Sequence, residues 1–307
     1  MRFYLMKCAS QFMENSRNID RDIYELLEAI KNADIKGVAR VMKRYGYTDL
    51  HFAVIECRMN KIRRLLERGA DPNAESEAKI TPLHEAAKSC PEAIPILLKH
   101  GADPHVRDKG GLTPLHVAAL EGSAEAAKAL IPHADVNIRD NENKTPLHLA
   151  LEYEHCDVAM LLLQHGADIN VVDGDGRTPL HLASGAGCVE VVKLLLQRGA
   201  DVSVRDGKNN TVLHYAVKSL NKEVAELVLN AADVNAKNAY GETPLKVLMR
   251  ECARWDSKRR QCYEVAKLLV ARGANPNIRD SRGTSPLDSA KLIGYSELVE
   301  LFRSVPP

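Results

Sequence analysis

This chain of 307 residues has little excess charge of either sign, no long apolar run and few aromatic residues. Lys and Arg together number 42 and Asp and Glu 41, so no overall field favours nucleic acid or an anionic membrane. No stretch approaches the ~20 apolar residues that span a bilayer. The first apolar run is about four residues long, shorter than a signal-peptide core of roughly 7 to 15. We expect a cytoplasmic protein, with the nucleus as the alternative, that is not secreted by a signal peptide.

The cysteines are scattered along the chain, and their spacing suggests no framework. The seven cysteines are Cys8, Cys57, Cys90, Cys156, Cys188, Cys252 and Cys262. Their number is odd and no C-x-x-C pair occurs among them. The sequence therefore predicts no disulfide framework, and a reducing compartment fits this pattern.

Signatures of common enzyme classes are also missing. The chain has no phosphate-binding loop of the type Gly-x-x-x-x-Gly-Lys-Ser/Thr, no Gly-x-Ser-x-Gly elbow and no His-Glu-x-x-His pair. We expect no catalytic residues, no cofactor and no metal site.

One four-residue stretch recurs along the chain. Thr-Pro-Leu-His occupies residues 81–84, 113–116, 145–148 and 178–181, and degenerate copies occupy 48–51, 211–214, 243–246 and 285–288. The starts of these eight tetrads are 33, 32, 32, 33, 33, 32 and 42 residues apart, the period of a stacked supersecondary unit. The long last interval contains an insertion.

The tetrad suits the start of a helix. Thr can cap the helix by accepting a backbone N–H bond, Pro fits the first helical position and Leu begins a buried stripe. Thr-Pro-Leu-His-x-Ala at this period, followed by Gly-Ala-Asp-x-Asn as at residues 69–73, resembles the ankyrin repeat. The resemblance covers residues 47 to 307. It implies an all-α solenoid in which each repeat has an inner helix, an outer helix and a β-hairpin finger.

The order of elements gives a domain layout. Residues 1–19 are predicted to be a flexible leader and residues 20–46 an N-terminal helical cap without the tetrad. Apolar residues recur at helical spacing in that cap: Ile23, Leu26, Leu27, Ile30, Ile35, Val38, Val41 and Met42. Residues 47–307 form the array of about eight repeats, with the insertion at about 252–262 and a C-terminal capping repeat.

The ends of the outer helices follow a glycine rule with two exceptions. Gly69, Gly101, Gly166, Gly199 and Gly273 stand where a left-handed C-terminal cap is expected. His133 and Ala231 replace that glycine in two repeats of 32 residues, so we expect a tighter turn there.

Two repeated polar features compete as binding sites. The tetrad histidines are His51, His84, His116, His148, His181 and His214. Equivalent positions in stacked repeats lie roughly 8 to 10 Å apart, too far to share one zinc ion, so we expect these imidazoles to bind neighbouring loop backbone. A basic series, Arg107, Arg139, Arg205, Lys237 and Arg279, is followed by acidic residues except at Asn238. It is interpreted as a solvated face rather than a phosphate site.

Residues after each tetrad line the surface that would bind a partner. In ankyrin-like arrays these inner-helix positions and the finger tips face a concave groove. The candidate groove residues are Val117, Leu120, Leu149, Tyr153, Leu182 and Tyr215. A partly exposed apolar ridge marks an interaction surface, but the same residues are also common there for packing. Both interpretations stay open at this point.

The insertion is the feature that the repeat does not require. Arg254, Trp255, Lys258, Arg259 and Arg260 concentrate positive charge around the single Trp of the chain. Trp255 either packs over the outer helices or serves as an aromatic anchor flanked by cations for an acidic partner or a phosphate. Nucleic acid is disfavoured because no other aromatic residues interleave with these cations.

The resemblance implies a non-catalytic scaffold or adaptor that binds another protein through the groove and the finger tips. A host-directed effector of an intracellular bacterium or virus would use the same groove and is the first alternative. Nucleic-acid or phosphoinositide binding through the basic insertion is the second. We expect a monomer without a membrane span.

Overall fold

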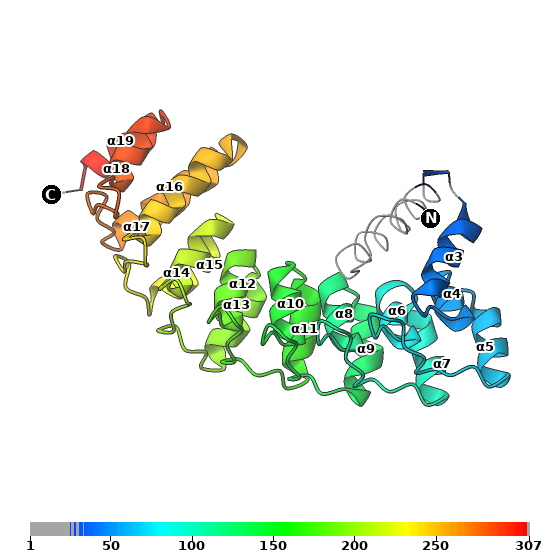
Figure 1. The fold of residues 1–307 in the computed structure, drawn as a ribbon. Helices are drawn as coiled ribbons and strands as arrows, with labels where there is room; N and C mark the ends of the chain where they lie inside the picture. The colour runs from blue at the N-terminus through cyan, green and yellow to red at the C-terminus, as the bar shows by residue number, and fades with distance from the viewer. Residues whose placement is uncertain (1–24, 26–27, 29–30, 33, 306–307) are drawn as a thin grey trace. The chain divides into compact units, whose positions relative to one another are not determined.

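The protein is described by a computed structural model that covers Glu25, Glu28, residues 31–32 and residues 34–305 (Figure 1). The leader predicted at residues 1–19 and the first half of the predicted cap lie outside the described residues, apart from the few named here. Two compact units are present: residues 1–118 with 123–135, called unit 1, and residues 119–122 with 136–307, called unit 2.

Unit 1 is built from short helices. They are α3 (Ile35–Arg44), α4 (Asp49–Ile55), α5 (Met59–Glu67), α6 (Pro82–Ser89), α7 (Ile94–Lys99), most of α8 (Pro114–Glu121) and α9 (Ala124–Leu130), with 3-10 turns η1 (Pro91–Ala93) and η2 (Ile131–His133). Val38, Val41 and Met42 of α3 form a buried cluster against which Phe52 and Ile55 pack. The second half of the predicted cap is therefore a helix whose apolar stripe covers the first repeat.

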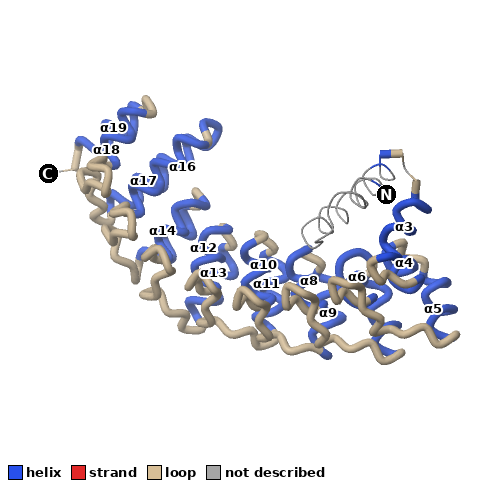
Figure 2. Tube along the Cα trace, viewed as in Figure 1, coloured by secondary structure: helices blue, strands red, loops and turns tan. Residues whose placement is uncertain are grey.

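Unit 2 repeats the same helix pair. Its helices are α10 (Pro146–Glu152), α11 (Cys156–Gln164), α12 (Pro179–Ala186), α13 (Val189–Gln197), α14 (Val212–Ala216), α15 (Lys222–Leu229), α16 (Pro244–Arg254), α17 (Arg259–Ala271), α18 (Pro286–Leu292) and α19 (Ser296–Arg303), with η3 (Val217–Ser219) and η4 (Asp256–Lys258). Within each unit the helices stand side by side and long loops link one pair to the next (Figure 2). The predicted all-helical repeat solenoid is confirmed. In the described part of the chain, no helix is long and apolar enough to cross a membrane.

Each inner helix begins at the tetrad, as predicted. At Thr81 the capping box is complete: the Thr hydroxyl accepts from the backbone of His84, and the His84 ring accepts from the backbone N–H of Thr81. The following Pro82 occupies the first turn, where its missing N–H costs nothing. Equivalent capping boxes start α4, α10, α12, α14 and α18.

The glycine rule at the outer-helix ends is also confirmed. Gly69, Gly101, Gly166, Gly199 and Gly273 all have φ between +81° and +89°. A side chain in this left-handed region would cost about 1 kcal/mol or more. The two exceptions end differently: α9 passes into η2, which ends at His133, and Ala231 closes a tight turn onto the carbonyl of Val228. The tighter turn expected there is therefore present.

The finger loops contain no regular β-hairpin, so that detail of the prediction is not confirmed. Only an isolated bridge joins Arg205 to Thr211 within the described residues. Asp173 instead closes its loop, since its carboxylate accepts from the backbone N–H of Asp175 at 3.0 Å and of Arg177 at 2.8 Å. Successive fingers are joined by single backbone bonds, such as Gly207 N to Asp175 O at 2.7 Å.

The cysteine prediction is wrong. Three disulfides are present, Cys57–Cys90, Cys156–Cys188 and Cys252–Cys262, with Cα–Cα distances of 5.3, 5.6 and 5.7 Å. Repetition explains the first two, because partners 33 and 32 residues apart occupy similar places in adjacent repeats. The expectation of a reducing compartment rested on the absence of pairing, and it loses that basis.

Candidate partner-binding surfaces

Most of the tetrad histidines join neighbouring repeats. His84 receives the Thr81 N–H on Nδ1 at 3.2 Å, and its Nε2–H donates to the carbonyl of Leu112 at 3.0 Å. His51 and His214 make the same bond to Ile80 and Glu242, each at 3.0 Å. Burial lowers the pKa of all three to about 4, so the rings are neutral near pH 7. The predicted binding of loop backbone is confirmed for His51, His84, His148 and His214, whereas Nε2 of His181 has no hydrogen-bond partner among the described residues.

The basic series binds carbonyl oxygens of the finger loops. Arg139 donates to Val172 O at 3.5 Å, Arg205 to Lys237 O at 3.1 Å and Lys237 to Arg279 O at 3.3 Å. Arg279 donates to Gly283 O. Arg139, Arg205 and Lys237 thus hold one finger to the next, whereas Arg279 bonds within its own finger.

The candidate groove residues differ in exposure. Leu149 and Leu182 are buried, at 4% and 6% exposure, so they offer little surface to a partner. Val117 and Leu120 on α8, and Tyr215 on α14, are half-buried. Tyr153, which follows α10, is 53% exposed. The structure therefore leaves Tyr153 as the most accessible apolar group among them.

An ionic network is centred on Glu152, which precedes Tyr153 in the chain. Glu152, the last residue of α10, is 2.8 Å from the Lys144 ammonium and 3.0 Å from the Arg177 guanidinium, which belong to successive finger loops. Arg177 also donates to Asp173 at 2.7 Å. Burial alone would raise the pKa of the Glu152 carboxyl, but Lys144 and Arg177 outweigh it and lower that pKa. The network therefore stays charged and joins the end of α10 to two finger loops.

Tyr215 continues the surface toward the C-terminus. Its hydroxyl donates to Asp206 at 2.8 Å, its ring meets the edge of His181 at 5.2 Å between centroids, and the Lys218 ammonium lies 4.2 Å from its centroid. Burial, followed by the Asp206 carboxylate, raises the pKa of the Tyr215 hydroxyl. Burial, followed by the charge of Arg250, lowers the pKa of Lys218. Tyr215 is thus held in place, with Lys218 covering its ring.

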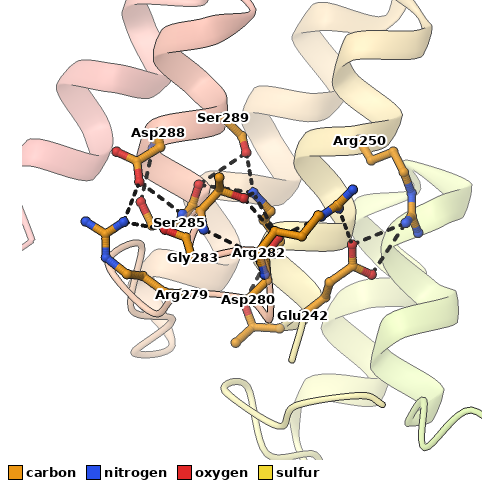
Figure 3. A network of polar contacts seen from close by, with 12 residues as sticks. Glu242, Arg250, Arg279, Asp280, Arg282, Gly283, Ser285, Asp288 and Ser289 are labelled. Atoms are coloured by element: carbon orange, nitrogen blue, oxygen red, sulfur yellow. Dashed lines mark hydrogen bonds and ion pairs between the residues drawn. The ribbon is translucent and has the colours of Figure 1, made fainter. Parts of the chain in front are cut away.

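A second polar network occupies the last two repeats (Figure 3). Glu242 is buried at 4% exposure, and its carboxylate is 3.3 Å from Arg250 and 3.6 Å from Arg282. Both arginines are largely exposed, at 56% and 75% of their side-chain surface. Their guanidinium groups are thus exposed to solvent while the buried Glu242 carboxylate holds them in place.

Lys246 stands where other tetrads have His, and sequence reasoning assigned it no role. Its ammonium donates to Ser289 Oγ at 2.6 Å and Thr284 Oγ1 at 2.8 Å, and lies 3.5 Å from Asp280. The side chain is 8% exposed. It replaces the imidazole bond between repeats with a bond from a longer, charged donor. A Lys in place of the tetrad His, with Asp280 and Thr284 in the next finger, was the signal available in the sequence.

The insertion lengthens both helices of its repeat, since α16 runs to Arg254 and α17 starts at Arg259. Trp255 lies between them and is 46% exposed. Arg254 and Lys258 lie 5.8 and 5.6 Å from its ring centre. Arg259 points elsewhere: its guanidinium lies over the ring of Tyr295 at 5.2 Å, and its carbonyl accepts from the Tyr295 hydroxyl at 2.6 Å.

Comparison with known families assigns the fold. The family described as "Ankyrin repeats (3 copies)" matches residues 5–108, 83–173, 166–238 and 205–280. The chain belongs to the ankyrin repeat family. An ankyrin repeat protein of Rickettsia bellii (strain RML369-C) is 35% identical over 72 residues, which are 24% of this chain and 38% of that protein. The chain thus matches well under half of that relative's length.

Membership gives a coarse functional statement. Ankyrin repeats are generally modules for protein–protein interaction, and the family is typically non-enzymatic. The ankyrin helices of this chain place two kinds of accessible surface in unit 2: the row at the ends of the inner helices and the basic insertion.

Proposed function

We propose that this ankyrin repeat chain is a non-catalytic adaptor that binds another protein through the inner-helix ends and finger loops of unit 2. The observation that carries this proposal is Tyr153, which is 53% exposed and follows Glu152 of the Lys144–Glu152–Arg177 network in the chain. A large aromatic group next to fixed charges has the composition of an interaction hot spot. Leu120 and Tyr215 add half-buried apolar area within the same unit.

Site-specific photocrosslinking tests this surface. A benzophenone amino acid at position 153 should crosslink a partner in source-cell extract that the same group at position 292 does not. Leu292 is the matched control because it is an exposed apolar residue, at 89%, on α18.

Affinity of the purified partner then decides the proposal. Tyr153→Ser should weaken binding by more than about 30-fold, the scale of a hot-spot residue, because it removes the accessible aromatic group. Leu292→Ser should leave the Kd unchanged. Equal Kd values for the wild type and Tyr153→Ser would refute this surface as the binding site.

A further inference from the structure

A basic pocket lies at the insertion, apart from the groove residues. It has a volume of about 630 Å³ and is formed by the turn before α15 and the start of α17. Lys222 contributes from the turn, and Lys258, Arg260 and Glu264 contribute from the insertion side. The pocket therefore lies at the end of the repeats where turns connect the inner helices to the outer helices.

Positive charge in this pocket exceeds negative charge. Lys222 is 3.3 Å from Glu264, which neutralises one cation. Among the described residues, no ion pair is found for Lys258 or Arg260, and both are exposed. Two positive charges are thus left for a ligand to neutralise.

Trp255 extends the pocket with an apolar group. The Lys258 ammonium both lines the pocket and lies 5.6 Å from the Trp255 ring centre, so the two features are contiguous. Trp is the residue type most enriched at binding hot spots, together with Tyr and Arg. Almost half of this indole remains exposed, at 46%.

The insertion is held in a defined conformation. The Cys252–Cys262 disulfide joins the two ends of the segment that carries Trp255. Tyr295 of the last repeat donates to the Arg259 carbonyl at 2.6 Å and so fixes the start of α17. A binding surface that is already ordered loses less conformational entropy when it binds.

Hydrogen-bond donors in the pocket suit carboxylates. The Asn221 side-chain oxygen caps α15 by accepting from the N–H groups of Glu223 and Val224 at 3.0 and 3.3 Å. Its side-chain NH₂ is then the polar group left for a ligand, and it lines the same pocket. Within the part of the chain that the structure describes, the side chains of Lys258 and Arg260 likewise have no hydrogen-bond acceptor.

We propose that this pocket and Trp255 dock an acidic peptide segment of a partner protein, with carboxylates on Lys258 and Arg260 and an apolar side chain against the indole. None of the residues that line the pocket is aromatic, so Trp255 offers a single stacking surface, whereas single-stranded nucleic acid is bound by successive aromatic groups. Glu264 within the pocket disfavours a densely charged polyphosphate. Spaced carboxylates fit this mixed pocket better.

Peptide selection provides the test. The oxidised full chain is immobilised and used to select from a random 12-residue phage library. We expect enrichment of sequences with several Asp or Glu and one large apolar residue. A selected peptide, synthesised, should change the fluorescence of Trp255, which is the only Trp in the chain.

Charge variants make the result specific. Lys258→Gln with Arg260→Gln should raise the peptide Kd at least tenfold, whereas Lys267→Gln, an exposed cation elsewhere on α17, should not change it. Tyr153→Ser should also leave it unchanged, which separates this site from the groove surface. The proposal fails if selected peptides are not acidic, or if acidic peptides bind the double variant as tightly. It also fails if a ten-nucleotide oligothymidylate or vesicles with phosphoinositide bind the wild type more tightly than the peptide.

Discussion

At the scale of single residues, the tetrad histidine is both a helix cap and a link between repeats. His84 uses both ring nitrogens, one toward its own Thr81 and one toward Leu112 of the next repeat. The neutral ring satisfies this arrangement because Nδ1 accepts while Nε2 donates. A second proton on the ring would sit on Nδ1, where it would face the backbone N–H of Thr81, so two donors would oppose each other.

This arrangement predicts acid sensitivity. His51, His84 and His214 have a pKa lowered from 6.5 to about 4 by burial. Because the unfolded chain binds protons first, the stabilising contribution is fully present above pH 6.5 and is lost as pH falls toward 4. The free energy of unfolding, measured by urea titration, should therefore decrease across this window. His84→Gln should show a shallower decrease, and an unchanged slope in that variant would contradict this account.

The partners of Lys246 could not be predicted from the sequence pattern alone. The sequence marked it as a departure from the tetrad, but its bonds to Thr284 and Ser289 depend on the register between two repeats. The same limit applies to Leu149 and Leu182. Their place after the tetrad could be read from the sequence, whereas their burial depends on how closely the neighbouring helices pack.

At the scale of helices and loops, starts and ends could be predicted because they depend on local chemistry. Thr and Pro define the first turn of each inner helix, and glycine at positive φ ends the outer helix. The cysteine pairs could not be recognised from the number of cysteines or from C-x-x-C spacing, because these rules describe small secreted domains rather than stacked repeats. Cys57 and Cys90 each stand nine residues after the first residue of a tetrad, and that shared repeat position was the usable signal.

The disulfide between α11 and α13 should stabilise unit 2. Cys156 and Cys188 are 32 residues apart. Closing a loop of this length lowers the entropy of the unfolded chain and so raises the free energy of unfolding by about 3 to 4 kcal/mol. We expect dithiothreitol to lower the thermal midpoint of the oxidised protein. The double variant Cys156→Ala, Cys188→Ala should lose less stability on reduction than the wild type.

Thiol counting checks the same prediction directly. Under denaturing conditions without reductant, iodoacetamide should modify one of the seven cysteines, since six are paired. Mass spectrometry should show seven modified after reduction. Seven modified cysteines before reduction would show that the pairs are not formed in solution.

At the scale of the whole molecule, repeat architecture makes stability local. Each repeat packs against its immediate neighbours, so interior repeats are stabilised on two sides and terminal repeats on one. In unit 2, α12 and α13 bury Leu180, Val192 and Leu195 completely. The last pair, α18 and α19, buries Leu298 and Phe302 but leaves Leu292 89% exposed. Opening should therefore begin at this end of the unit.

Amide hydrogen exchange, read by mass spectrometry of peptic fragments, measures this gradient. Amides of α12 and α13 should exchange at least about tenfold more slowly than those of α18 and α19, because local opening at the end breaks one repeat interface rather than two. Lys246→Met should speed exchange in α18 further, since it removes the bonds from Lys246 to Thr284 and Ser289. Exchange in α12 and α13 should stay unchanged in that variant. Uniform protection from α12 to α19, or equal acceleration everywhere in the variant, would mean that unit 2 opens only as a whole.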